Sequence, residues 1–417
     1  MSILIKNVTL NNHITDILIN KNKITKVEKN ISVSANKIID GTNKIAFPGF
    51  YNTHTHAAMT LLRGYSDDLP VLQWLEEKIW PFEGKLTEND VYIGTKLACL
   101  EMIKTGTVFF NDMYWYFDGV VKAVEDMGIR AAVNTVVIDF NDPENFKKQI
   151  PRIQTEYEKS KSFPDTIQYA IGAHSIYAVS EFALRWAADF AKKNDITLHI
   201  HVSETEHELN ECLKHRNMRP VEYLESIGFL EPKVISAHSI WLNDNEIEIL
   251  KKHNVTIAHI PTSNMKLSSG VFQYKRFTDY MDHVTIGTDG CASNNNLDMG
   301  EEMKFASCTA KMESKDPTMM DAETALHIAT ENGAKAFDIN AGKIEEGKLA
   351  DLILVNLNHH LMVPAHNHVS NFVYSANSSV IDTTICNGNI LMENGIVPGE
   401  QEILEEAKDC IGKLIEK

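Results

Sequence analysis

The stretch FPGFYNTHTH, residues 47–56, begins with apolar residues and ends with two histidines two positions apart. We expect it to form a β-strand. In a strand, residues i and i+2 face the same side, so His54 and His56 would point in one direction. Two imidazoles in that arrangement can chelate a borderline metal such as Zn²⁺. Two incidental surface histidines would give the same pattern, so the interpretation depends on what the rest of the chain places beside them.

Seven more apolar stretches follow, and most are separated by amphipathic helical runs. One such run is 87–105, where Thr87 and Asp90 form a capping box and Gly106 ends the helix. This alternation predicts an α/β protein with a (β/α)8 TIM barrel over residues 48–344. A doubly wound open sheet alternates in the same way, but no GxGxxG follows an early strand here. The seven stretches are TVFFNDMY (107–114), RAAVNTVVID (130–139), IQYAIGAHS (167–175), TLHIHVSE (197–204), VISAHS (234–239), TIAHIPTS (256–263) and VTIGTDG (284–290).

The two ends of the chain share a different pattern. Residues 1–47 and 345–417 contain short stretches of alternating apolar and polar residues, with Asn and Gly at the turns. A terminal helix is expected at 400–416. Because the ends of a domain often lie close together, we expect them to form one small β-sandwich domain beside the barrel.

The composition is that of a globular protein and excludes several classes of function. Of the 417 residues, 43% are hydrophobic and 23% are charged; the net charge of −17 disfavours nucleic acid, whose phosphates require clustered Lys and Arg. No apolar stretch approaches the roughly 20 residues that span a bilayer, and residues 1–16 are too polar for a signal peptide. Six scattered cysteines without a CxxC pair fit a reducing cytoplasm. We therefore expect a cytoplasmic protein that acts on a small molecule, not on a membrane or nucleic acid.

Residues able to bind a metal or transfer a proton fall at the ends of five predicted strands. In barrels the active site lies at the C-terminal ends of the strands, so these side chains are expected to converge on one point. Their number favours a metal site over isolated surface residues. The residues are His54, His56, His174, His201, Glu204, His238 and Asp289.

Several of these residues have more than one interpretation. Asp289 could cap the following helix, but beside three histidines it is the natural fourth metal ligand. Glu204, three residues after His201, suits general acid–base work, although it could also be a helix cap. His238 could be a fifth ligand of a binuclear site or could stabilise charge on the attacking water. The fourth strand ends in AIGAHS and offers no Lys to bridge two metals, so one metal is favoured.

Two other histidines lie within predicted strands. His199 is two positions before His201, and His259 lies within the seventh predicted strand, in AHIPTSN. For both, packing in the core is the favoured interpretation over direct metal binding.

The chain resembles the amidohydrolase superfamily and, within it, the methylthioadenosine/S-adenosylhomocysteine deaminase family. The resemblance covers nearly the whole chain, and the combination of stretches is specific. They are FPGFYNTHTHAAMTLLRGYSDDLPVLQWL, IWPFEGKLTENDVYIGTKLACLEM, GAHSIYAVS, HIHVSETEHE, SAHSIWL, HIPTSNMKL, GTDGCASNNNLDM and GKIEEGKLADLILV.

The resemblance implies a hydrolytic deaminase that converts an adenine nucleoside to its inosine analogue and ammonia. It implies one divalent metal, with Zn²⁺ expected and Fe²⁺, Mn²⁺ or Ni²⁺ as alternatives. A homo-oligomer would follow the family habit. The implied metal ligands are His54, His56, His201 and Asp289; Glu204 would protonate the purine ring, His238 would assist the attacking water, His174 would contact the nucleoside, and Glu83 would accept hydrogen bonds from the ribose hydroxyls.

The chain departs from the family at one point. Some members carry arginines after the third strand that bind the carboxylate of S-adenosylhomocysteine, and the corresponding positions here are Thr135 and about Lys147. Thr135 and Lys147 cannot replace a bidentate guanidinium. Methylthioadenosine, adenosine and 5′-deoxyadenosine are therefore favoured as substrates over S-adenosylhomocysteine. Alternative functions are an aminohydrolase or chlorohydrolase acting on a guanine, pterin or triazine ring and, more remotely, a non-catalytic binding barrel.

Overall fold

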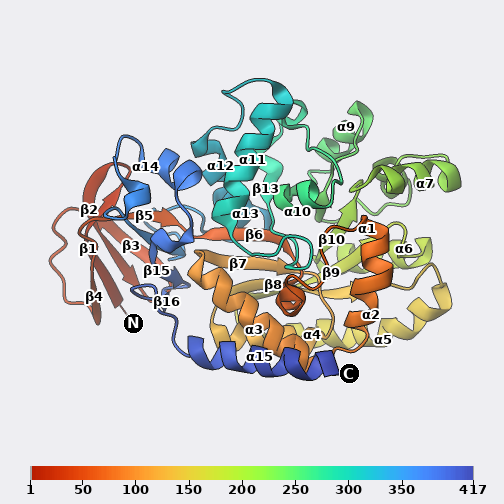
Figure 1. Ribbon diagram of the computed structural model, residues 1–417, viewed down its shortest axis with the longest axis horizontal. Helices are drawn as coiled ribbons and strands as arrows, with labels where there is room; N and C mark the ends of the chain where they lie inside the picture. The colour runs from red at the N-terminus through yellow and green to blue at the C-terminus, as the bar shows by residue number, and fades with distance from the viewer. Residues whose placement is uncertain (1, 417) are drawn as a thin grey trace.

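Eight parallel strands form a nearly closed barrel at the centre of the computed structural model, which describes residues 2–416 (Figure 1). Their order in the sheet is their order in the chain. The predicted TIM barrel is therefore confirmed, and each of the eight predicted strands is present. They are β6 (Phe50–Thr55), β7 (Thr107–Asp112), β8 (Arg130–Val137), β9 (Ile167–Ser175), β10 (Thr197–Val202), β11 (Val234–His238), β12 (Thr256–His259) and β13 (Val284–Ile286).

Side chains and a carbonyl, rather than a strand ladder, join the first barrel strand to the last. The hydroxyls of Thr53 and Thr285 lie 2.7 Å apart, and Thr53 Oγ1 also donates to the carbonyl of Ile286 at 3.0 Å. The amides of Thr288 and Asp289 both donate to the carbonyl of His54, at 3.1 and 3.0 Å. The closure of the barrel therefore brings the chain segment after β13 against the end of β6.

Helices cover the outside of the barrel, and the predicted helix at 87–105 is present as α3 (Glu88–Lys104). Its N-terminus has the expected capping box between Thr87 and Asp90, and Gly106 follows it with φ 85°, a conformation that favours glycine. The other elements of the barrel region are η1 (Ala57–Leu62), α1 (Val71–Trp74), η2 (Leu75–Ile79), α2 (Trp80–Glu83), α4 (Phe117–Met127), α5 (Pro143–Ser160), α6 (Glu181–Asn194), α7 (Glu206–Arg216), α8 (Pro220–Ser226), α9 (Asp244–Lys252), α10 (Pro261–Lys266), η3 (Tyr274–Phe277), η4 (Met281–His283), α11 (Met299–Ser314), α12 (Ala322–Ala329) and α13 (Glu331–Ala336).

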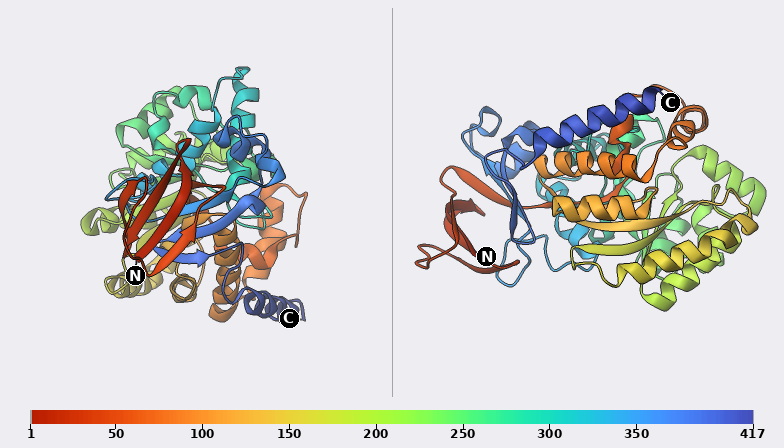
Figure 2. Two further views of the ribbon diagram at one scale, coloured as in Figure 1. Left: turned by 90° about the vertical axis from the view of Figure 1, so that its left-hand side faces the viewer. Right: turned by 90° about the horizontal axis from the view of Figure 1, so that it is seen from below.

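A second sheet is built from both ends of the chain, as expected (Figure 2). Its middle pair joins β5, near the N-terminus, to β14, more than three hundred residues later, with Ile45 opposite Val355. Side chains such as Ile3, Ile17 and Leu352 give this sheet a hydrophobic cluster of its own. Its strands are β1 (Ser2–Leu10), β2 (His13–Asn20), β3 (Lys23–Glu28), β4 (Lys37–Asp40), β5 (Lys44–Pro48), β14 (Leu352–Asn356), β15 (Ile381–Cys386) and β16 (Asn389–Met392).

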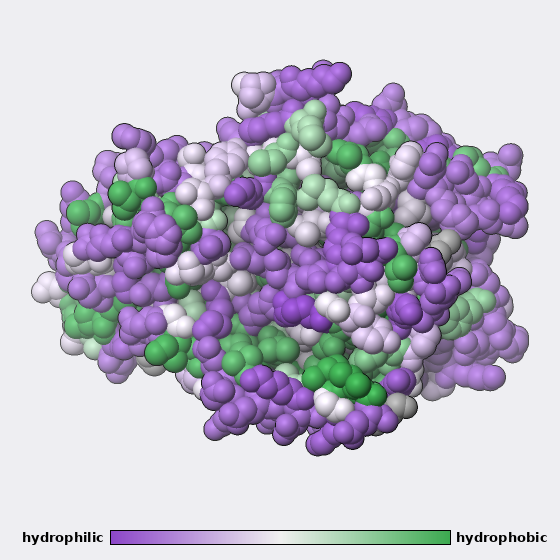
Figure 3. Space-filling view, in the orientation of Figure 1, coloured by the Kyte–Doolittle hydropathy of each residue, from purple (hydrophilic) through white to green (hydrophobic). Residues whose placement is uncertain are grey.

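The C-terminal helix α15 (Glu400–Glu416) runs back along the barrel beside α3 (Figures 1 and 2). It buries Ile403, Ala407 and Leu414. Between β14 and β15 lie the short elements η5 (His360–Met362), α14 (His368–Ser370), η6 (Asn371–Ser375) and η7 (Ser378–Val380). The face seen in Figure 3 is covered largely by hydrophilic residues, with hydrophobic ones in small areas between them. Across residues 2–416, no helix combines the length and apolar character that a membrane crossing requires.

Candidate metal and substrate site

One cavity opens at the C-terminal ends of the barrel strands and contains the residues singled out from the sequence. Six of the seven strand-end residues line it, and His54 lies fully buried at its base. Glu83, from α2, is also part of the wall. The six are His56, His174, His201, Glu204, His238 and Asp289.

The carboxylate of Asp289 faces the His-x-His pair at the end of β6. Its Oδ1 lies 3.3 Å from Nε2 of His54 and 3.2 Å from Nε2 of His56. Its Oδ2 accepts hydrogen bonds from the hydroxyls of Ser263 (2.7 Å) and Ser293 (2.8 Å). One carboxylate oxygen is therefore held by serines, and the other is directed at the two imidazoles.

The remaining ring nitrogens of the site histidines are already engaged. Nδ1 of His56 donates to the carbonyl of Met113 at 2.6 Å, and Nδ1 of His201 donates to the carbonyl of His174 at 2.7 Å. Because a carbonyl only accepts, Nδ1 is the donor in both rings, and Nε2 is the nitrogen left to face the site. This is the arrangement in which metal-binding histidines are usually held.

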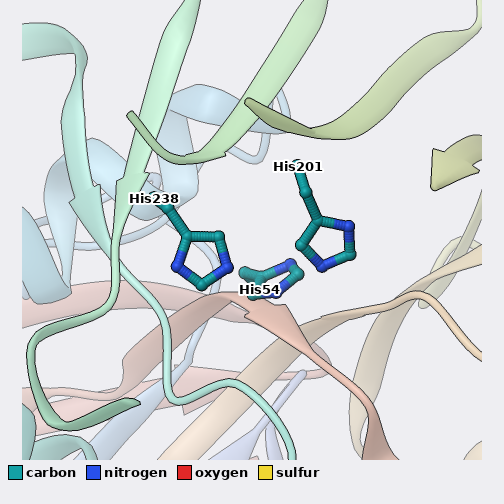
Figure 4. Close-up of side chains that lie close together, drawn as sticks. All are labelled: His54, His201 and His238. Atoms are coloured by element: carbon teal, nitrogen blue, oxygen red, sulfur yellow. The ribbon is translucent and has the colours of Figure 1, made fainter. Parts of the chain in front are cut away.

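His238 is oriented in the same way. Its Nδ1 lies 2.8 Å from Oδ1 of Asn264, which leaves Nε2 toward the cavity. Figure 4 shows the rings of His54, His201 and His238 facing one another. Single ligand atoms of these three lie within 4.8 Å of one another, as do those of His54, His56 and Asp289. The donor set of imidazoles and one carboxylate fits a transition metal such as zinc.

Burial and mutual contact perturb the acidity of these groups. Burial lowers the pKa of His54 to about 4. Burial opposes protonation of His56 as well, but its contact with Asp289 outweighs this and raises its pKa to about 9. Burial would raise the pKa of Asp289, yet the hydrogen bonds from His54 and His56 hold it well below its usual value. The carboxylate is therefore ionised and available as a ligand.

Glu204 and His174 complete the polar side of the cavity. Oε2 of Glu204 lies 3.9 Å from Nε2 of His238, and burial raises the pKa of Glu204 above its usual value. A raised pKa suits a group that must deliver a proton near neutral pH. Burial lowers the pKa of His174 to about 3, so this ring is neutral, and its Nδ1 lies 3.1 Å from the hydroxyl of Ser175.

Glu83 reaches the cavity from the helical segment α1–η2–α2, outside the strands. Nε1 of Trp115 donates to its Oε2 at 3.3 Å, and burial raises its pKa. Strand-end reasoning alone did not find this residue, because it lies in a helix that follows a long loop. The family resemblance was the only signal for it.

Apart from Ser293, the rest of the cavity wall is formed by aliphatic and aromatic residues. None of the described lining residues is Lys or Arg. Thr135, considered from the sequence as a substrate position, is turned away and donates to Glu156 at 2.6 Å, while Lys147 is exposed and pairs with Glu144. Alternation along β8 explains this, since Val136 and Ile138 face the cavity instead. The apolar wall consists of Met59, Val71, Trp74, Leu75, Ile79, Trp80, Met113, Tyr114, Trp115, Val136, Ile138, Tyr177 and Leu267.

The two strand histidines expected in the core are both buried, at 0% and 2% exposure. His199 is nevertheless connected to the site, since its Nε2 lies 2.8 Å from Nδ1 of His54. His259 packs between the rings of Phe272 and Tyr274. Sequence reasoning did not identify Ser263, Ser293 or Asn264, because their role depends on which ligand they contact.

A TIM barrel whose strand ends gather imidazoles and a carboxylate around one point defines a metal-dependent hydrolase. Residues 45–391 match the amidohydrolase family, and the chain belongs to this family. The resemblance noted from the sequence is confirmed.

Two relatives and one solved structure extend this comparison. The chain is 45% identical to a 5′-deoxyadenosine deaminase of Methanosphaera stadtmanae, over 98% of this chain and 97% of that one. It is 46% identical to 5-methylthioadenosine/S-adenosylhomocysteine deaminase 1 of Archaeoglobus fulgidus, over 92% and 91%. The fold matches a crystal structure of an adenosine deaminase from Xanthomonas campestris with bound zinc, with a TM-score of 0.94 at 28% identity, covering 100% of this chain and 99% of that chain.

Proposed function

We propose that this protein hydrolytically deaminates an adenine nucleoside whose 5′ substituent is small and uncharged, releasing ammonia and an inosine-type product. The observation that carries the proposal is one cavity that holds a histidine–carboxylate metal site, a buried acid and a separate carboxylate suited to a sugar. The names of the relatives support deamination of an adenine nucleoside, and the preference for a small, uncharged 5′ substituent is argued from the cavity wall.

The ligands of the metal would be His54, His56, His201 and Asp289. Zn²⁺ fits this donor set best, while Fe²⁺, Mn²⁺ and Ni²⁺ accept similar ligands. When bound, the metal would supply the Lewis acidity that activates water for attack at neutral pH. The serines on Asp289 and the carbonyls on His56 and His201 would hold the ligands in place before the metal arrives.

The protein groups would move the protons of the reaction. Water adds to C6 of the purine and the bond from C6 to the amino nitrogen breaks. Glu204 would deliver a proton to N1 of the ring, for which its raised pKa is suited. Asp289 would accept one proton from the attacking water and return it to the departing amine. The proton left on the C6 hydroxyl would pass to Glu204 as the C6 carbonyl forms, which restores the acid. His238 would stabilise the charge that develops on the attacking oxygen.

Glu83 and the apolar wall would select the nucleoside. A carboxylate can accept hydrogen bonds from both hydroxyls of a ribose, and Trp115 orients the Glu83 carboxylate for this. His174, on β9, would also contact the nucleoside. With no Lys or Arg among the described lining residues, an amino-acid carboxylate at the 5′ position would lose its water without gaining a cationic partner. This favours 5′-deoxyadenosine, methylthioadenosine and adenosine over S-adenosylhomocysteine.

The test is ammonia release from these four nucleosides by the purified protein, with its metal content measured in the same preparation. We expect one metal per chain and a kcat/KM lower for S-adenosylhomocysteine than for the other three. Glu83→Gln should raise KM for nucleosides about 10- to 100-fold, the effect of losing charged hydrogen bonds, and should leave free adenine unaffected. Glu77→Gln, an exposed change in the same helical segment, is the control. Failure to deaminate any adenine nucleoside would exclude the proposal.

A further inference from the structure

The peptide group that joins Ser203 to Glu204 is hydrogen bonded on both sides. Its carbonyl accepts from the amides of Ile240 (3.1 Å) and Trp241 (3.0 Å) in the segment after β11. Its N–H donates to Oε2 of Glu208 at 2.9 Å, and the preceding amide, of Ser203, donates to Oε1 of the same carboxylate at 3.0 Å. Both oxygens of one buried side chain therefore bind the backbone that carries Glu204.

This use of Glu208 differs from the capping that its position in the sequence predicts. Thr205 is the N-cap of α7, and Glu208 is the third residue of the helix, so the pattern is that of a capping box. In α3 the equivalent residue, Asp90, accepts from the amide of its own N-cap at 2.9 Å. Glu208 instead reaches the two residues before its N-cap. Ser203 has φ 51°, and this turn directs two successive amides at one carboxylate.

We infer that Glu208 is a positioning residue for Glu204, which rests on the proposed role of Glu204 as proton donor. The direction of the Glu204 side chain follows from its backbone, and that backbone is bound by Glu208 on one side and by the β11 segment on the other. Glu208 is 3% exposed, so no solvent replaces its two hydrogen bonds if they are lost. Its carboxylate acts on the reaction only through Glu204.

Glu208→Gln tests the inference with minimal change of shape. An amide has one acceptor oxygen, so one of the two backbone N–H groups would face an NH₂ group instead. We expect kcat to fall about 10- to 100-fold through misplacement of Glu204, with KM within about threefold and the metal content unchanged. Glu222→Gln is the matched control: it is also the third residue of a helix and accepts a cap amide at 3.1 Å, but that amide belongs to Arg219 and not to the backbone that carries Glu204. It should behave as the wild type.

Hydrogen exchange of the Ser203 and Glu204 amides separates this inference from the proposed function. Both should be strongly protected in the unaltered protein and should exchange faster in Glu208→Gln. Glu208→Asp, which keeps the carboxyl group but is one methylene shorter, should change exchange and kcat in the same direction. Unprotected amides in the unaltered protein, wild-type kcat in both variants, or a loss of activity that follows a loss of metal would each overturn the inference. If the unaltered protein deaminates no adenine nucleoside, the proposed function fails while the exchange result still decides whether Glu208 holds this backbone.

Discussion

In the proposed metal site, oxygen atoms orient the residues proposed as ligands. His56 donates Nδ1–H to the carbonyl of Met113, just after β7, His201 donates to that of His174 on β9, and Asp289 accepts from two serine hydroxyls. Such partners determine the tautomer and direction of each ligand before a metal binds. His56 and His201 are therefore already held in the orientation that the proposed metal site requires.

Ser263→Ala should weaken metal binding about 10-fold to 100-fold, because Asp289 loses one of the two hydroxyls on its Oδ2. The measurement is competition with a chelator of known affinity, followed by the remaining metal per chain. Ser226→Ala on α8, whose hydroxyl bonds the Tyr223 carbonyl, is the control. Metal affinity equal to that of the unaltered protein would show that Ser293 alone orients the carboxylate.

At the scale of single elements, two barrel strands end earlier than the sequence predicted, because the residues that follow them bind another strand or begin a helix. β12 was expected to extend to residue 263 but ends at His259, since Pro261 is the first residue of α10. β13 was expected to reach 290 but ends at Ile286, because the amides of Thr288 and Asp289 bond the His54 carbonyl. The strands were therefore predictable as elements, whereas their ends depend on contacts with distant residues.

Within the small sheet, Asp16 on β2 joins three parts of the N-terminal region. Its carboxylate accepts from Lys6 Nζ (2.6 Å), the Asn7 amide (2.9 Å) and the Ile31 amide (2.9 Å). Burial would raise the pKa of Asp16, but these hydrogen bonds outweigh burial and lower it from 3.8. Its ionised form is therefore more favoured in the folded protein than in the unfolded chain.

Asp16→Asn should lower the free energy of unfolding by about 1–3 kcal/mol at pH 7. The folded pKa is depressed, so the contribution of Asp16 is present above the unfolded value of 3.8 and is lost as the pH falls through the folded value. The stability difference between the two proteins should thus be constant near neutrality and shrink below about pH 4. Urea unfolding as a function of pH measures it, and a difference that instead grew in acid would contradict the assignment.

At the scale of the whole molecule, a buried ion pair joins the barrel to the second sheet. Nε of Arg130, the first residue of β8, donates to Oδ2 of Asp351 at 2.8 Å, and Tyr51 donates to the same oxygen at 2.8 Å. Arg130 also donates to Oδ1 of Asn387 at 2.6 Å, and both members of the pair are almost completely buried. This contact lies at the end of the strands opposite to the cavity.

Arg130→Met should lower the free energy of unfolding by about 3–5 kcal/mol, because it leaves the Asp351 charge buried without its partner. The folded fraction should keep its kcat, since Arg130 is far along β8 from the cavity wall. Lys122→Met, which removes an exposed pair with Asp126, should leave the free energy of unfolding close to that of the unaltered protein. Urea unfolding monitored together with activity compares the two variants. An equal loss of stability in both would show that the buried pair stabilises the protein no more than the exposed pair.

The sequence alone determined the barrel and predicted most residues of the candidate site. Eight apolar stretches predicted the strands, and in a barrel the ends of parallel strands must meet, so His54, His56, His201, Glu204, His238 and Asp289 could be grouped without coordinates. The tertiary structure decided what chain order does not encode. Whether Thr135 or Val136 faces the cavity depends on strand rotation, and Ser263, which binds Asp289, lies on α10 and reaches it only through packing. A strand's position follows from local periodicity, but the orientation of a side chain follows from hydrogen bonds between residues distant in sequence.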